Sequence, residues 1–360
     1  MATNNTMFGN KFDVQALVDT FSDRATKGVL YLVIDDANVA PKLYIYNKLK
    51  EVTENYDAKN KNYINIAFAD YKVKKILVAV GHDGVDGISG CLDTTLALLN
   101  KVRFNGYLVA PQVSKDEDKR KIVDFIKTQR NDEGYPLKGV LYNYPADSEA
   151  ITNFTGTDLG IDDFTSDEYC LDVACARCVL GANENLTNHV AKRVKSCDIK
   201  DDNDKHVSNG ELFLWNDGIN IVFSTDVNSL QTIPQNQNEY LTHNRVVEVL
   251  DMVKEDINTI LNQKVTGKMG NSYSNRRTVV AIINKYLKSL KGYLSNDDES
   301  YAELDLEATK EYLDKLQVDY SEMKDEEILK QKIGTYVFIN VTLYVMDIME
   351  HINFKIKYQI

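Results

Sequence analysis

Short apolar runs alternate with helical patterns through the first two thirds of the chain, and this alternation constrains the fold most strongly. Four runs are apolar enough for strands buried on both faces, at residues 29–34, 76–80, 107–110 and 140–144. Helical spacing of apolar residues lies between and after them, at 63–68, 92–102, 122–126 and 166–180. Strands alternating with helices predict an α/β fold with a mainly parallel sheet and flanking helices.

The pattern changes after Pro234 and the polar residues 235–238, which indicate a linker. Before it, the turn at Asn216-Asp217-Gly218 predicts a hairpin between 212–215 and 219–223. After it, apolar residues mark two amphipathic helices and a shorter one, at 246–261, 279–294 and 307–316. Strand-like alternation follows at 336–345 and 352–360. The second half is therefore expected to be a C-terminal α+β region.

Extended arms are expected at both ends of the chain. Alternating apolar residues mark three candidate segments for strand pairing, two in the arms and one in the α+β region before the C-terminal arm: Phe12, Val14 and Ala16; Val337, Ile339, Val341 and Leu343; and Ile352, Phe354, Ile356 and Tyr358. Alternation alone leaves two readings of the last strand open, pairing within the chain and donation to a neighbour. The expected domains are an N-terminal arm, an α/β core, a C-terminal α+β domain and a C-terminal arm, at 1–24, 25–235, 236–345 and 346–360.

Composition excludes several classes of protein. With 42 basic and 54 acidic residues the net charge is −12, which argues against a nucleic-acid partner because phosphate binding needs a basic surface. The apolar stretch at 336–346 is too short for a membrane span, so no membrane insertion is expected. Five cysteines in a chain of 360 residues do not suggest a disulfide framework and indicate a reducing compartment.

Three motifs invite a search for chemistry, and each departs from the pattern it resembles. The glycine-rich loop 81–90 lies where phosphate-binding loops occur, but Asp83 and Asp86 would repel a phosphate. Cys175 and Cys178 are spaced as a CxxC pair, yet they fall inside a helix and favour core packing. Residues 201–206 start like a calcium loop and then diverge, so a solvated loop is expected. No catalytic set, metal site or cofactor is predicted. An α/β nucleotide-binding enzyme using the loop 81–90 is the alternative.

Charge is segregated in the C-terminal half. Residues 264–290 carry six basic and no acidic side chains, whereas residues 291–330 carry five basic and thirteen acidic ones. Two ordinary solvated faces would explain this, and so would an electrostatically matched interface.

The sequence resembles contractile tail sheath proteins of the small type found in myophage tails and phage-tail-like bacteriocins. The resemblance extends over roughly residues 20–360 and depends on the order and spacing of short motifs. These motifs are Ile151-Thr152-Asn153-Phe154-Thr155, Ser166-Asp167-Glu168-Tyr169, Trp215-Asn216-Asp217-Gly218, Val227-Asn228-Ser229-Leu230, Gly267-Lys268, Asn271-Ser272-Tyr273, Leu304-Asp305-Leu306-Glu307-Ala308, Glu311-Tyr312-Leu313 and Asp347-Ile348-Met349-Glu350-His351-Ile352.

The resemblance implies a structural protein without catalytic activity or cofactor. Sheath subunits stack as six-fold rings around a tail tube in a metastable extended state, and contraction drives the tube through the target cell envelope. The implied partners are further copies of the chain, the tail tube protein, and baseplate and tail terminator proteins. The implied location is a virion tail or phage-tail-like particle, assembled in the bacterial host cytoplasm. Arm strands would be exchanged between subunits.

Charge segregation adds a hypothesis about the tube contact. The basic region would face acidic patches on the tube through Lys268, Asn271, Tyr273, Arg276, Arg277 and Lys285. A contact of this kind is weak and screened by salt, which suits a surface that must release on contraction.

Overall fold

The computed structural model describes residues 28–102, 105–181, 184–233 and 239–350, and these form two compact units. We call residues 28–251 together with 347–350 the sheet unit, and residues 252–346 the helical unit. Helix α7 (Asn244–Lys264) begins in the sheet unit and ends in the helical unit. The predicted N-terminal arm and the predicted strand 352–360 lie outside the described residues.

The sheet unit is built on a seven-stranded sheet with the order β2-β3-β1-β4-β5-β6-β7. Its parallel strands are β1 (Val29–Asp35), β3 (Lys75–Gly81), β4 (Gly106–Val109), β5 (Leu137–Tyr142), β6 (Ile151–Phe154) and β7 (Glu211–Leu212). One strand, β2 (Leu43–Tyr46), pairs antiparallel with β3 at the edge. The predicted mainly parallel sheet is confirmed; β2, β6 and β7 were not predicted.

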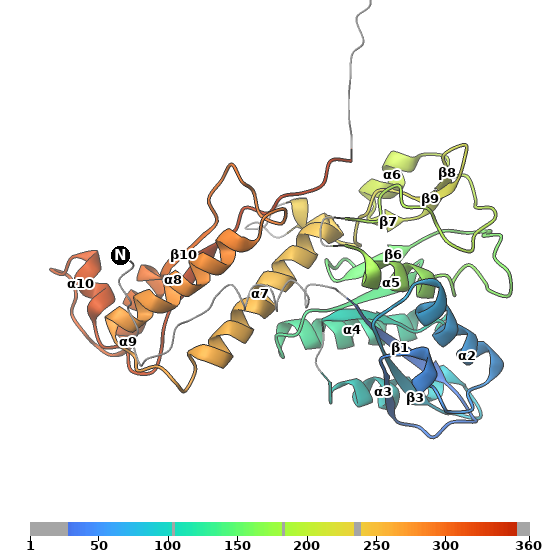
Figure 1. Cartoon of the computed structure of the whole chain (residues 1–360), viewed down its shortest axis with the longest axis horizontal. Helices are drawn as coiled ribbons and strands as arrows, with labels where there is room; N and C mark the ends of the chain where they lie inside the picture. Colours follow the sequence, from blue (N-terminus) through green and yellow to red (C-terminus); the bar gives the residue numbers. More distant parts are fainter. Residues whose placement is uncertain (1–27, 103–104, 182–183, 234–238, 351–360) are drawn as a thin grey trace, which may run out of the picture. The chain divides into compact units, whose positions relative to one another are not determined.

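Helices cover both faces of this sheet, and two apolar cores result (Figure 1). One face carries α2 (Ala58–Asn65), η3 (Ile66–Asp70) and α5 (Cys170–Val179), and the other carries α3 (Ile88–Leu99) and α4 (Asp116–Asn131). Successive residues of β1 alternate between the two cores, with Leu32 in one and Val33 in the other. A strand buried on both faces is apolar at most positions, which is why such strands stand out in the sequence.

The remaining elements of the sheet unit are short. They are β8 (Leu214–Asn216), β9 (Ile221–Phe223), α6 (Asn203–Ser208), η2 (Leu49–Glu51) and η4 (Glu239–Thr242). The antiparallel pair β8–β9 confirms the predicted hairpin. The prediction of a loop at 201–206 was partly wrong, because α6 begins at Asn203. Asp202 caps this helix by accepting a hydrogen bond from the backbone N of Lys205.

The helical unit contains the second half of α7, three further helices and a two-stranded sheet (Figure 1). The bounds are α8 (Tyr273–Ser289), β10 (Tyr301–Leu304), α9 (Leu306–Lys315), α10 (Asp325–Lys330) and β11 (Ile339–Thr342). Tyr286 of α8 donates a hydrogen bond to Asp256 of α7 at 2.7 Å. The side chain of Asn284 bonds both backbone atoms of Ala302, at 2.6 and 2.9 Å, and so joins α8 to β10.

The predicted strand at 336–345 is shorter in the structure. Only Ile339–Thr342 forms β11, which pairs antiparallel with β10 from Leu304↔Ile339 to Tyr301↔Thr342. An isolated bridge between Leu294 and Val345 continues this pairing. Alternation marked the right region but overestimated the strand length.

Candidate assembly sites

The segment 347–350 is the first part of the predicted C-terminal arm, and it belongs to the sheet unit. Asp347 Oδ2 lies 2.5 Å from Nδ1 of His243, the residue that precedes α7. Glu350 Oε1 accepts hydrogen bonds from Thr187 Oγ1 at 2.8 Å and from the side chain of Asn185. Two carboxylates therefore anchor the chain at the root of the predicted arm.

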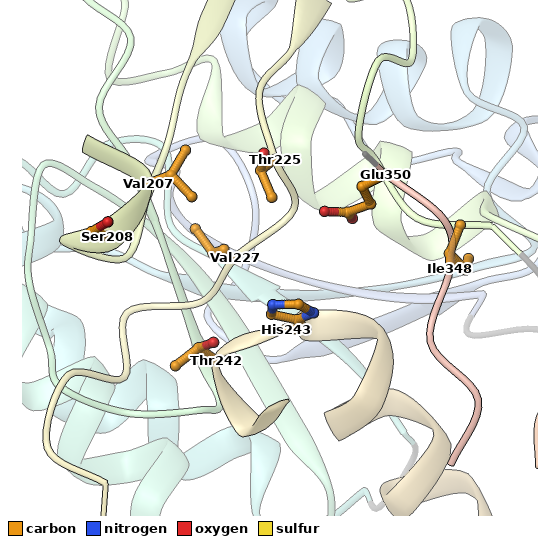
Figure 2. A pocket seen from close by; sticks show the side chains of 8 residues that line it. All are labelled: Val207, Ser208, Thr225, Val227, Thr242, His243, Ile348 and Glu350. Carbon is orange, nitrogen blue, oxygen red and sulfur yellow. The ribbon is translucent and has the colours of Figure 1, made fainter. Parts of the chain in front are cut away.

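A surface pocket of about 480 Å³ lies beside these contacts (Figure 2). Its lining residues are Val207, Ser208, Thr225, Val227, Thr242, His243, Ile348 and Glu350. The hydrogen bond that the Asp347 carboxylate accepts raises the pKa of His243 above its ordinary value, against the opposing effect of burial. The same contact lowers the pKa of Asp347, so the pair favours the charged forms of both side chains.

A buried ionic network holds the first turns of α7 in the sheet unit. The guanidinium of Arg177, which is fully buried, donates two hydrogen bonds to Asp226 and lies 4.0 Å from Glu248 of α7. Burial alone would lower the pKa of Arg177, but the carboxylates of Asp226 and Glu248 outweigh it and the pKa is raised. Asp226 N donates to Thr187 Oγ1 at 2.9 Å, so Thr187 links this network to Glu350.

A second cluster repeats this arrangement one turn further along α7. Arg130 binds both carboxylate oxygens of Asp251, at 2.8 and 3.0 Å, and Lys138 Nζ lies 3.3 Å from the same carboxylate. Burial lowers the pKa of Lys138, while Asp251 opposes this effect. Helix α7 is therefore fixed to the sheet by charge pairs where it leaves the unit.

Sequence reasoning did not identify this network. A signal was present, because charged residues stand among the apolar residues that open α7, and residues 244–249 are all buried. The partners, however, lie far away in the chain: Arg177 and Asp226 are separated by 49 positions, and Arg130 and Asp251 by 121. Pairing over such distances has no local pattern.

The predicted strand-exchange residues fall into two groups. The structure places Val337, Ile339, Val341 and Leu343 in or beside β11, which pairs with β10 of the same chain. The other predicted residues, Phe12, Val14, Ala16, Ile352, Phe354, Ile356 and Tyr358, lie outside the described residues. Their exchange between subunits stays a prediction.

The tube-facing candidates lie on α8 and the loop before it, but they differ in exposure. Lys268, Arg277 and Lys285 are exposed, whereas Arg276 is only 4% exposed and donates to the backbone oxygen of Gln331. Tyr273 is half-buried, and its ring lies 6.0 Å from each of the two guanidinium groups of α8. Asn271 is exposed and bonds the backbone oxygens of Gly334 and Tyr336. Arg276 therefore does not present its charge at the surface of this unit.

The loop 81–90 uses carboxylates of the chain to bind its own backbone. Asp83 N donates to Asp35 Oδ1 at 3.1 Å, and Val85 N donates to Asp83 Oδ1 at 2.8 Å. A Cβ at position 90 would lie 1.8 Å from Asp83 Oδ2, so Gly90 makes room for a carboxylate. The last three residues of the loop, 88–90, form the first turn of α3. Amides that already bind carboxylates are not free to bind phosphate.

The other motifs have structural roles. Cys175 and Cys178 are buried in α5, which confirms core packing, and burial raises the pKa of the Cys175 thiol. Among the described residues, no three His, Cys, Asp or Glu side chains are grouped as metal ligands. The described helices include none with the length and apolar character needed to cross a bilayer.

The sequence was compared with known protein families and with curated proteins. No family model matches the sequence. A tail sheath protein of Clostridium phage phiCD119 is 29% identical over 362 residues, covering 96% of this chain and 97% of that protein. The Bacillus subtilis protein YqbK is 28% identical over 56% of this chain, and the match covers 45% of YqbK.

Solved structures share the fold at low sequence identity. A sheath tail protein from Listeria innocua superposes with a TM-score of 0.68 at 15% identity, covering 91% of this chain and 99% of that one. The helical sheath of the anti-feeding prophage in its contracted state gives a TM-score of 0.64 at 14% identity, covering 92% and 93%. The chain is thus a homologue of phage tail sheath proteins and has their fold, as its motifs predicted.

Proposed function

We propose that this chain is the structural subunit of a contractile tail sheath. Its copies stack as six-fold rings around a tail tube in a metastable extended state, and contraction drives the tube through the target cell envelope. The observation that carries this proposal is the relation to a tail sheath protein over 96% of the chain, together with the sheath fold. A tail sheath protein has a structural role, so the proposal includes no catalytic activity.

Strand exchange would join the subunits. A two-stranded sheet is marginal by itself and is usually completed by further strands. The pair β10–β11 is such a sheet, and the predicted arm residues have the alternation that strand addition requires. Arms of neighbouring subunits would extend this sheet and keep subunits connected while they rotate during contraction.

The partners follow from this role. They are further copies of the chain, the tail tube protein, and baseplate and tail terminator proteins; nucleic acid and membrane lipid are not among them. The location is a virion tail or phage-tail-like particle, assembled in the bacterial host cytoplasm. Head-to-tail contacts from one six-fold ring to the next do not close, and they give the helical stack.

Removal of residues 351–360 tests the exchange of arms. We expect the truncated chain to stay folded and soluble but to lose polymerisation, because its terminal strand can no longer extend a neighbour's sheet. Sedimentation of the polymer, with circular dichroism as the control for folding, measures both effects. Normal polymers from the truncated chain would show that this strand is not donated.

The tube contact is tested by charge reversal at its exposed cations. Arg277→Glu together with Lys285→Glu should weaken assembly on tubes, and lower salt should enhance the difference from the native chain. A double reversal at Lys192 and Lys195, which belong to the sheet unit, is the matched control. Unchanged assembly of the first variant would exclude this face as the tube contact.

A nucleotide-binding enzyme is the competing class. It would use the loop 81–90, whose amides bind Asp35 and Asp83. Binding a phosphate there would require displacement of two carboxylates of the chain, so this function is disfavoured. Measurable ATP binding to the purified chain would restore it.

A further inference from the structure

A second pocket, of about 390 Å³, lies within the helical unit. It is formed by the end of α7, the first turns of α8, the loop between them and the segment around the start of β11. Apolar side chains make up much of its lining: Leu261, Val265, Met269, Val279, Val337 and Ile339.

The walls of this pocket are held by hydrogen bonds within the chain. Asn271 Nδ2 donates to the backbone oxygens of Gly334 and Tyr336, at 2.8 and 2.7 Å, and so closes the loop against the segment before β11. Ser272 Oγ accepts from Asn275 N at 3.2 Å and caps α8. The pocket is therefore formed before any ligand arrives, which lowers the cost of binding.

Two buried polar residues line the pocket with unused hydrogen-bonding atoms. Asn275 and Arg276 are 8% and 4% exposed. Asn275 donates to Gly270 O at 2.6 Å, but its Oδ1 has no hydrogen-bond partner among the described residues. Arg276 donates through Nη2 to Gln331 O at 3.1 Å. Its Nε, too, has no hydrogen-bond partner within the described residues.

The charge of Arg276 is also uncompensated. Arginine is almost never buried without a partner, and within the described residues no carboxylate forms an ion pair with Arg276. Burial lowers the pKa of Arg276, as expected for a cation without a counter-charge. A buried charge and an unsatisfied amide oxygen both destabilise the isolated subunit, and an incoming carboxylate with a backbone N–H would satisfy both.

The surroundings favour an acidic ligand. Residues 264–290 have six basic and no acidic side chains, and Lys268 and Arg277 are exposed close to the pocket residues in sequence. This charge attracts acidic segments and repels basic ones. The apolar lining selects for a carboxylate that is carried by an otherwise apolar segment.

We propose that this pocket binds an aspartate or glutamate side chain flanked by apolar residues on a partner protein. The carboxylate accepts a hydrogen bond from Arg276 Nε, and a backbone N–H of the same segment donates to Asn275 Oδ1. That the partner is a protein of the assembled particle rests on the proposed sheath function, whereas the ligand chemistry rests on the pocket.

Two peptides probe the ligand chemistry with the native full-length chain. One is Ala-Leu-Glu-Leu-Ala, acetylated and amidated at its ends, and the other has Gln in place of Glu. We expect about tenfold tighter binding of the Glu peptide, since a charge-assisted hydrogen bond is lost with Gln. The Nε–Hε resonance of Arg276 in nuclear magnetic resonance spectra should move with the Glu peptide alone.

Arg276→Met and Arg277→Met form a matched pair of variants, one buried and one exposed. The preference for the Glu peptide should vanish in Arg276→Met and persist in Arg277→Met. Because the first variant removes an uncompensated buried charge, its melting temperature should equal or exceed that of the native chain. A marked loss of stability together with native peptide preference would show that Arg276 only anchors α10 through Gln331.

The peptide results and the assembly results are independent. Equal binding of both peptides by the native chain, or an unmoved Arg276 Nε resonance, would overturn the pocket even if the chain forms sheath-like cylinders. Discrimination between the peptides without any cylinder formation would instead support the pocket and contradict the proposed function.

Discussion

At the scale of single residues, the root of the C-terminal segment depends on an ion pair that titrates. Asp347 raises the pKa of His243 above its ordinary value, so the protonated form persists to a higher pH in the folded chain than in the unfolded one. A raised histidine pKa gives stability that is complete below the unfolded pKa of about 6.5. This contribution is lost as the pH rises through the folded pKa.

His243→Ala should therefore lower the free energy of unfolding more at pH 6 than at pH 9. We expect a difference of about 1 kcal/mol at most, because the pair is partly exposed and screened by solvent. Urea unfolding at both pH values measures it, and the exposed His189→Ala is the control. An equal loss at both pH values would show that His243 acts by packing alone.

At the scale of elements, α7 is fixed at its start by buried charge and continues into a second unit. Glu248, near its start, lies against Arg177, and Asp251, about one turn further along, lies against Arg130. Such pairs stabilise little in net terms, but they set one register for the helix because a shifted helix would leave charges buried without partners. The sheet unit therefore defines the position of this helix.

Arg177→Met should reduce the free energy of unfolding by about 3–5 kcal/mol, because the buried carboxylate of Asp226 would lose the guanidinium that pairs with it. Lys195→Met is the control: it breaks an exposed pair with Asp162 and should cost about 0–1 kcal/mol. Chemical denaturation of both variants gives the comparison. Similar losses would mean that the network does not hold α7.

Elements buried on both faces were predictable and the others were not. The strands β1, β3 and β4 are uninterrupted apolar runs, so burial is visible in the sequence. In β6, the polar residue Asn153 is buried, and its burial is possible because its Oδ1 accepts a hydrogen bond from Tyr144 N at 2.7 Å. The two-residue β7 is too short to leave any pattern.

The candidate sites, too, could be predicted from the sequence only where a local pattern marks them. The basic region was visible as a charge count, but the burial of Arg276 could not be predicted, because it depends on residues 270–275 and 331–337 meeting in space. Local patterns predict which residues form a helix face; they do not predict which distant segment covers it.

At the scale of the whole molecule, the described residues form two compact units, and α7 runs from one into the other. The sheath fold extends over most of the chain, with 91% covered by the Listeria innocua structure. Under the proposed function, energy would be stored because copies of the chain pack in two arrangements and the extended one is trapped kinetically. No nucleotide is required by such a mechanism.

The central claim is that copies of this chain polymerise into a sheath, and negative-stain electron microscopy of the purified chain tests it most directly. Samples at several protein concentrations separate polymerisation from chance aggregation. The account predicts hollow cylinders of uniform width that become more numerous with concentration. Small dispersed particles at every concentration would contradict it.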